Sequence, residues 1–93
     1  MLVLKVCKTD RFLTDLETVV LFIAQDNVRA AIEMEQRLHS QVDCLADPNF
    51  PRRKGRVRGT LELVAHPHYV VVLQQNATTV TVLNLLHVAR QYP

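Results

Sequence analysis

The sequence predicts a single α+β domain over residues 1–93, of order β-α-α-β-β-β, with a helical hairpin packed on a mainly antiparallel sheet. Three observations carry this prediction. Ninety-three residues with a hydrophobic share of 48% are enough to build one core. In the first half of the chain, apolar residues recur three or four positions apart, as on one face of a helix. In the second half they form short runs between turn residues, which is typical of strands.

The first element is predicted to be a strand, because residues 2–7 (LVLKVC) are mostly apolar or β-branched. This run is too short for a signal peptide or a membrane span, so we expect a cytoplasmic protein without membrane contact. A helix should follow, since Thr9 and Asp10 offer side-chain oxygens that can cap it. Its apolar face is formed by Phe12, Leu13, Leu16, Val19, Val20 and Ile23.

A second helix is expected after the polar tripeptide at positions 25–27, where Asp26 or Asn27 can cap it. Pro48 and Pro51 end it, because a proline disfavours helical conformation in the residue before it. Two helices with so short a connection should pack as an antiparallel hairpin. The apolar stripe of the second helix consists of Val28, Ala31, Ile32, Leu38, Val42 and Leu45.

The last three elements are predicted to be strands at residues 60–65, 69–74 and 78–88. The segments between them, 66–68 and 75–77, contain proline or asparagine and read as tight turns. Because these connections are short, the three strands should form an antiparallel meander. Both helices would then cover one face of the sheet.

Charge is divided unevenly along the chain. Residues 1–50 contain five basic and eight acidic residues, whereas residues 51–93 contain six basic residues and one acidic residue. Five of the basic residues lie within the ten-residue stretch PRRKGRVRGT, which we expect to be exposed. This asymmetry predicts an anionic partner, either a nucleic acid or an acidic protein segment. The five are Arg52, Arg53, Lys54, Arg56 and Arg58.

The sequence lacks the motifs of several kinds of catalytic site. The only serine, Ser40, follows His39 directly, and adjacent positions on a helix do not face each other. Two glycines cannot make a glycine-rich phosphate loop. Cys7 and Cys44 lack the spacing of a zinc site and read as buried free thiols. We therefore expect no cofactor and no catalytic residue of these classes.

The histidines leave two alternatives open. His66 and His68 flank a turn and could bind a metal, but no third ligand lies nearby in sequence, so we expect no metal site. Metal-free cleavage of RNA needs a base, an acid and cations around the phosphate. His87, Arg90 and Tyr92 could supply such groups together with the arginines of the basic stretch. A structural, hydrogen-bonded role for His87 at the end of a strand is the other interpretation.

Three stretches carry a resemblance to a known family: TDLETVVLFIAQDNVRAA, GRVRGTLELVAHPHYVVV and TVLNLLHVARQYP. Together they make nearly the whole chain similar to the ParE/RelE superfamily of toxins from bacterial toxin–antitoxin modules, and to its ParE branch in particular. The last stretch is the most specific, because it places four residue types at set spacings. The matching positions are Gly55, Arg56, Gly59, Glu62, Tyr69, His87, Arg90, Gln91 and Pro93.

The chain departs from the family pattern at two places. Leu61 stands where arginine is usual, and Leu73 and Gln74 stand where tyrosine or arginine is frequent. In the RelE branch, basic and aromatic groups on this part of the sheet help to cleave mRNA at the ribosome. The resemblance therefore implies the function of the ParE branch, a plasmid-maintenance toxin that inhibits DNA gyrase and blocks replication without being an enzyme. It also implies neutralisation by a cognate ParD-like antitoxin in a hetero-oligomeric complex.

The resemblance also implies two sets of contacting residues. The target-binding set is Arg52, Arg53, Lys54, Arg56, Arg58, His87, Arg90, Gln91 and Tyr92. The antitoxin-binding set is Leu16, Val20, Ile23, Glu62 and Tyr69. One alternative is a RelE-like ribosome-dependent endoribonuclease acting through Arg56, Arg58, His87, Arg90 and Tyr92. Another is a detoxified relative that only binds its antitoxin, which the departure at Leu61 keeps open.

Overall fold

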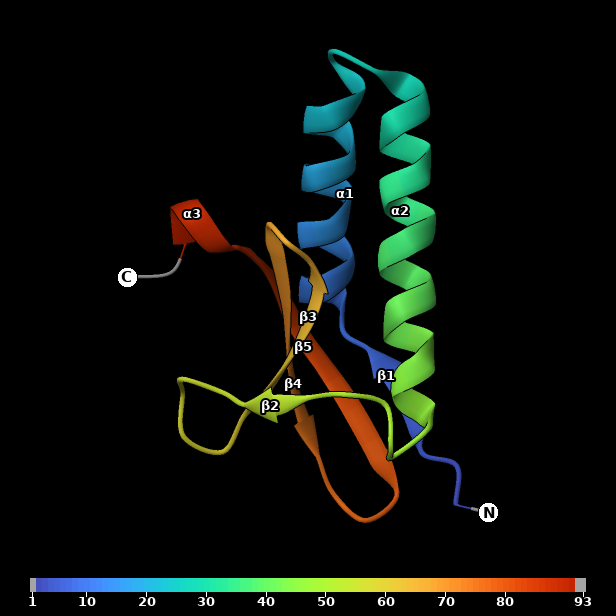
Figure 1. The fold of residues 1–93 in the computed structure, drawn as a ribbon, viewed down its shortest axis with the longest axis vertical. Helices are drawn as coiled ribbons and strands as arrows, with labels where there is room; N and C mark the ends of the chain where they lie inside the picture. Colours follow the sequence, from blue (N-terminus) through green and yellow to red (C-terminus); the bar gives the residue numbers. More distant parts are fainter. Residues whose placement is uncertain (1, 92–93) are drawn as a thin grey trace.

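The computed structural model describes residues 2–91, except the side chains of Arg90 and Gln91, and confirms the predicted α+β architecture (Figure 1). Two long helices, α1 (Asp10–Ala24) and α2 (Val28–Asp43), form a hairpin against a five-stranded sheet. The strands are β1 (Lys5–Lys8), β2 (Arg53–Lys54), β3 (Leu61–His66), β4 (Tyr69–Gln75) and β5 (Thr79–His87). A short 3₁₀ helix, η1 (Cys44–Ala46), follows α2, and a single-turn helix, α3 (Val88–Gln91), follows β5.

The sheet has the strand order β1-β5-β4-β3-β2. Strands β3, β4 and β5 form the predicted antiparallel meander, and β1 pairs in parallel with β5. The edge strand β2 was not predicted, because a two-residue strand carries no periodicity. It pairs with the start of β3, with Arg53 opposite Glu62 and Lys54 opposite Leu61. Part of the basic stretch is therefore sheet rather than loop.

Helix α1 begins as its sequence predicts and is fastened to β5. The hydroxyl of Thr9 accepts a hydrogen bond from the Phe12 amide at 3.2 Å and donates one to the Val82 carbonyl at 2.7 Å. One turn further, the Asp15 carboxylate accepts from the Leu85 amide at 3.1 Å. These contacts flank the point where the pairing of β4 with β5 shifts register. The hydrogen bonds from Thr9 and Asp15 to the backbone of β5 thus fix α1 on the sheet.

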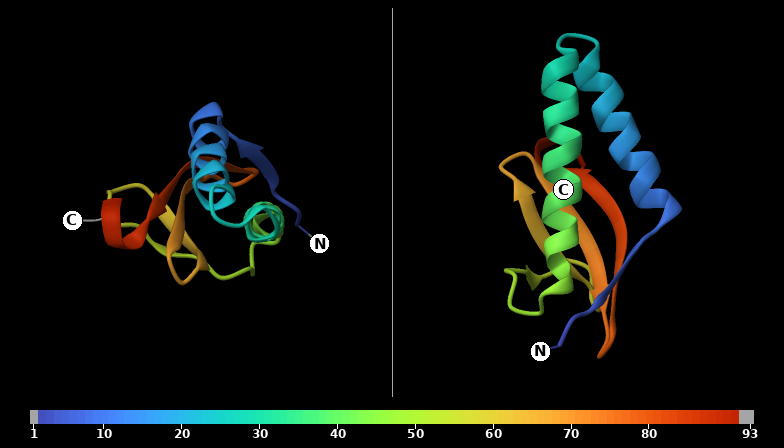
Figure 2. Two further views of the ribbon diagram at one scale, coloured as in Figure 1. Left: turned by 90° about the horizontal axis from the view of Figure 1, so that it is seen from above. Right: turned by 90° about the vertical axis from the view of Figure 1, so that its right-hand side faces the viewer.

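Helix α2 is capped by Asn27, whose side chain accepts from the Ala30 amide at 3.0 Å. In its second half Leu38 and Val42 are fully covered, whereas in its first half Val28 is 64% and Ile32 50% exposed. These two residues were predicted to face the core. The first turns of α2 project beyond the sheet together with the end of α1, so no strand lies beneath them (Figure 2). Neither of these helices is long and apolar enough to cross a membrane.

The core lies between the helical hairpin and the central strands. Every residue of β4 from Tyr69 to Leu73 is buried, and Phe12 and Leu16 of α1 and Leu38 and Val42 of α2 pack toward it. Strand β4 is central, and it reads as a continuous apolar run because the side chains on both of its faces are buried. The buried strand β4 pairs with β3, and β3 pairs with β2. This pairing places the basic stretch at the edge of the sheet.

Candidate target-binding site on the basic segment

The cations predicted from the sequence lie in residues 52–58, here called the basic segment. It begins at Arg52, whose guanidinium is held within the chain. It donates to the carbonyls of Phe50 at 2.9 Å, of Leu45 at 3.3 Å and of Asp47, and to the side-chain oxygen of Gln75 at 2.8 Å. Burial lowers the pKa of Arg52, and the charge of Asp47 opposes this effect. Arg52 therefore ties the end of η1 to β4, which corrects the expectation that it is an exposed cation.

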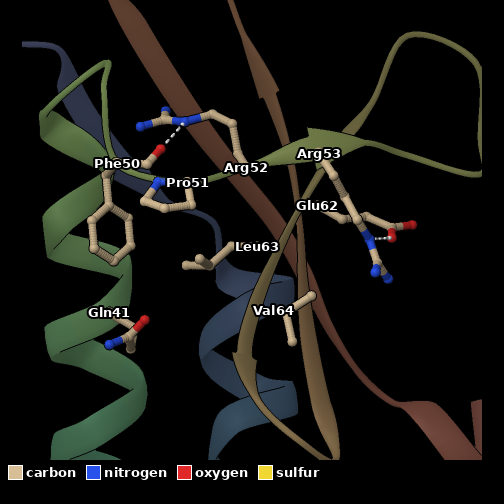
Figure 3. A pocket seen from close by; sticks show the side chains of 8 residues that line it. All are labelled: Gln41, Phe50, Pro51, Arg52, Arg53, Glu62, Leu63 and Val64. Carbon is tan, nitrogen blue, oxygen red and sulfur yellow. Dashed lines mark hydrogen bonds and ion pairs between the residues drawn. The ribbon is translucent and has the colours of Figure 1, made fainter.

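Arg53 is oriented by a buried carboxylate. Its Nε lies 3.1 Å from Oε1 of Glu62, which is only 3% exposed (Figure 3). The other oxygen of Glu62 accepts a hydrogen bond from the backbone amide of Arg56 at 3.2 Å. One carboxylate thus contacts the basic segment at two points.

The turn that follows β2 is closed by hydrogen bonds between its own residues. The Gly55 amide donates to the Thr60 carbonyl at 2.8 Å, and the Thr60 hydroxyl donates to the Val57 carbonyl at 2.6 Å. A Cβ on Gly55 would lie 2.2 Å from the Thr60 hydroxyl oxygen and 2.8 Å from its carbonyl oxygen, so a larger residue is excluded here. Gly59 has φ of +84°, which only glycine adopts readily. The two glycines give the turn its shape.

The remaining cations of the segment are on the surface. Lys54, Arg56 and Arg58 are exposed, and so is Val57 between the two arginines. Their charges lie within five positions, in β2 and in the turn that follows it, where they raise the local positive potential. The structure thus presents three exposed cations beside the oriented guanidinium of Arg53.

His87 lies in a cluster of aromatic rings at the far end of the sheet. Its Nδ1 accepts from the Ala89 amide at 3.2 Å, and its ring centroid is 5.1 Å from that of Tyr69 and 5.9 Å from that of His68. His66 completes the cluster, 5.4 Å from His68. Burial, the charge of Arg37 and the neighbouring His68 lower the pKa of His66.

The sequence did not reveal this ring cluster, although the pairing of Tyr69 with His87 follows once the strands are placed in register. The cluster lies at the His66 end of β3, whereas β2 pairs with the Leu61 end. His87 therefore lies near one end of β3, and the basic segment lies near the other. Among the proposed contacts near the chain end, Tyr92 lies outside the described residues, as does Pro93 of the terminal motif, and the side chains of Arg90 and Gln91 are not described.

The residues expected to contact an antitoxin are mostly inaccessible. Leu16, Glu62 and Tyr69 are buried, the first and last in the core and Glu62 beneath the basic segment. Leu16 lies on the helix stripe that faces the sheet, and Tyr69 lies in the central strand. Only Val20 and Ile23 of the five reach the surface, and both are half-buried. Contact of this set with an antitoxin stays a prediction, and in the folded chain only Val20 and Ile23 are accessible to one.

A groove between α2 and the β2–β3 edge offers a surface that the sequence did not indicate. It has a volume of about 310 Å³. Leu63 points toward α2, whereas the half-exposed Val64, the next residue of β3, lies on the other side of the strand, and Arg53 and Glu62 lie at one end (Figure 3). Its lining residues are Gln41, Phe50, Pro51, Arg52, Arg53, Glu62, Leu63 and Val64. Within residues 2–91, no three His, Cys, Asp or Glu side chains are placed to hold a metal ion.

Comparison with known proteins decides the family. Residues 7–92 match the sequence model of the "ParE toxin of type II toxin-antitoxin system, parDE". The chain belongs to the ParE toxin family. This ParE chain is 29% identical over 85 residues to the Sinorhizobium fredii protein named "Putative toxin Y4kP", a match that covers 91% of this chain and 88% of that protein.

A solved structure shares the fold of this ParE chain. It is described as the "Chromosomal ParDE TA system from P. aeruginosa", and it superposes with a TM-score of 0.80 at 14% sequence identity. The match covers 94% of this chain and 98% of the other. At this identity the similarity establishes the arrangement of the hairpin and sheet, and no residue role is transferred from it.

Proposed function

We propose that this chain is the toxin of a type II toxin–antitoxin module and that it inhibits DNA gyrase, thereby blocking replication. Membership of the ParE family is the observation that carries this proposal. The basic segment supports it, because Lys54 of β2 and Arg56 and Arg58 of the turn that follows are exposed. Such a cluster attracts an anionic surface, and gyrase with its bound DNA offers one.

The proposed mechanism is binding rather than catalysis. A ribonuclease would need a proton-transfer group close to its phosphate-binding cations. His87 is at the other end of β3 from the basic segment, and its Nδ1 is engaged by a backbone amide. This arrangement favours a surface that holds its target in an unproductive state over a surface that cleaves RNA.

The proposed antitoxin is ParD-like and has an acidic, initially disordered segment. The groove of about 310 Å³ fits such a segment, because its lining combines apolar residues, among them Leu63 and Val64, with a cation at Arg53. Apolar side chains would enter the groove while a carboxylate meets the guanidinium. We place this complex in the cytoplasm, where gyrase acts.

The experiment is expression of the chain without its antitoxin, together with a purified gyrase assay. We expect filamentous cells, a DNA-damage response, translation that continues at first, and loss of supercoiling activity. Coexpression of the antitoxin should restore growth. Rapid cleavage of ribosome-bound mRNA with gyrase unaffected would establish the RelE-like ribonuclease instead.

A third outcome concerns Leu61, where the chain departs from the family pattern. Leu61 is half-buried and pairs with Lys54. If the chain binds its antitoxin but arrests neither growth nor gyrase, it is a detoxified relative. Replacing Leu61 with arginine, the usual residue of the family at this position, would then be the direct test of whether this position removed toxicity.

A further inference from the structure

Glu62 is buried beneath a cluster of cations. Its residue is only 3% exposed, and no other charged side chain among those that the structure describes is buried. A carboxylate is stable in such a place only when its oxygens are matched by donors. Its partners therefore show what the residue does in the fold.

Two residues of the basic segment, Arg53 and Arg56, contact the carboxylate of Glu62. Oε1 accepts from Nε of Arg53 at 3.1 Å, and Oε2 accepts from the backbone amide of Arg56 at 3.2 Å. The first contact fixes a side chain, and the second fixes the backbone on the other side of Gly55. The carboxylate therefore bridges the two ends of the bend.

The surrounding backbone leaves little room for another arrangement. Arg53 and Glu62 are opposite each other in the β2–β3 pair, which places their side chains close together. The Gly55 amide bonds to the Thr60 carbonyl, and a Cβ on Gly55 would meet Thr60. The chain thus turns tightly enough for the Arg56 amide to reach the same carboxylate. Meanwhile 54% of the Arg53 side chain remains exposed to a partner.

We propose that Glu62 is a positioning residue that sets the direction of Arg53 and the backbone at Arg56, and so the geometry in which the basic segment meets an anionic partner. This inference rests on the proposed function, because it assigns the shape of the same surface. A guanidinium binds a phosphate or carboxylate best when its planar fork is correctly aimed. Cations that are already held in place lose less conformational entropy on binding.

The sign of the effect separates positioning from simple electrostatics. Replacing Glu62 with glutamine removes a negative charge and makes the segment more positive. If only the sum of charges mattered, binding to an anionic target would become stronger. If Glu62 positions the segment, binding becomes weaker although the positive charge increases.

The first measurement tests order in the segment and does not depend on the target. In the full chain carrying Glu62→Gln, we expect hydrogen exchange at the Arg56 amide to become about tenfold faster or more, because its bond to a charged acceptor is weakened. The Val71 amide, in the buried strand β4, should change little. Glu33→Gln is the matched control, since it removes an exposed carboxylate that pairs with Arg29 on α2. Unchanged exchange at Arg56 would overturn the inference.

The second measurement tests the consequence for function. We expect the concentration of Glu62→Gln that half-inhibits purified gyrase to rise about tenfold, with Glu33→Gln equal to the parent chain. Arg53→Lys serves as a second variant, because it preserves the charge and loses the guanidinium that Glu62 orients; it should also lose inhibition. Equal or stronger inhibition by Glu62→Gln would overturn the inference and leave the proposed function intact. Failure of the parent chain to inhibit gyrase would instead reject the proposed function, and exchange at Arg56 would then decide the role of Glu62.

Discussion

Neighbouring arginines of the basic stretch have different roles. Arg52 is engaged by three carbonyls and a glutamine side chain, Arg53 by a buried carboxylate, and Arg56 and Arg58 are on the exposed turn. The sequence predicted the cluster because charge density is visible in it. It could not separate the roles of these arginines, because the contacts of Arg52 depend on where η1 and β4 converge. The contacts of Arg53 with Glu62 depend on the pairing of β2 with β3.

The exposed pair gives the first residue-scale prediction. The double variant Arg56→Ala/Arg58→Ala should lose most of its toxicity while its melting temperature changes little, because removing exposed charges changes stability by less than about 0.5 kcal/mol. Lys5→Ala/Arg29→Ala is the matched control, since both of these cations are also exposed but lie outside the segment. Growth arrest and thermal unfolding are the measurements. Full toxicity of the first variant would remove these arginines from the mechanism.

Helix α2 illustrates what periodicity predicts at the scale of an element and what it does not. The spacing of its apolar residues predicted the helix and its cap at Asn27. It also placed Val28 and Ile32 in the core, because a stripe indicates which face is apolar but not how far the neighbouring sheet extends. The meander was predicted almost to its boundaries, since strong turn residues separate its strands.

A pair of substitutions tests this division of α2. Leu38→Ala should lower the free energy of unfolding by about 2–5 kcal/mol, because Leu38 is fully buried and its truncation leaves a cavity. Ile32→Ala should lower it by less than about 1 kcal/mol, because half of Ile32 is already exposed. Chemical denaturation of both variants measures the difference. Equal losses would mean that the projecting end of the hairpin is covered in solution.

His66, the last residue of β3, should make the stability of the fold depend on pH. Burial, Arg37 and His68 lower the pKa of His66, so the unfolded chain binds a proton at His66 more readily than the folded chain does. Stability from this group is therefore present above the unfolded pKa of about 6.5 and is lost as pH falls through the lower folded value. In His66→Asn, an asparagine oxygen can still accept from the His68 amide, as His66 Nδ1 does, but it does not titrate.

We therefore expect the melting temperature of the parent chain to fall more steeply than that of His66→Asn between about pH 7.5 and pH 5.5. Thermal unfolding at several pH values measures both slopes. His68 and His87 are present in both proteins, so the difference between the slopes isolates His66. Parallel slopes would contradict the assignment.

At the scale of the whole molecule, the groove beside β3 leads to a prediction about the partner. Val64→Asp should weaken binding of the proposed ParD-like antitoxin about tenfold or more, because a carboxylate would be buried against apolar side chains or repelled by the proposed acidic segment. Val28→Asp is the control, since Val28 is comparably exposed but lies at the projecting end of the hairpin. Calorimetric titration of each variant with the antitoxin measures the effect. Equal affinities would show that the antitoxin binds elsewhere.

The parallel pairing of β1 with β5 has a consequence for synthesis of the chain. Lys5 pairs with Thr79, about 70 residues later, and α1 is fastened to the same distant strand through Thr9 and Asp15. A contact of such long sequence separation forms only after the last strand has left the ribosome, which takes roughly 4–15 s at typical elongation rates. During that interval the basic segment, which precedes β3 in the chain, has left the ribosome although the sheet is not complete. The proposed antitoxin, when it is already present, can therefore meet the nascent chain before the fold is established.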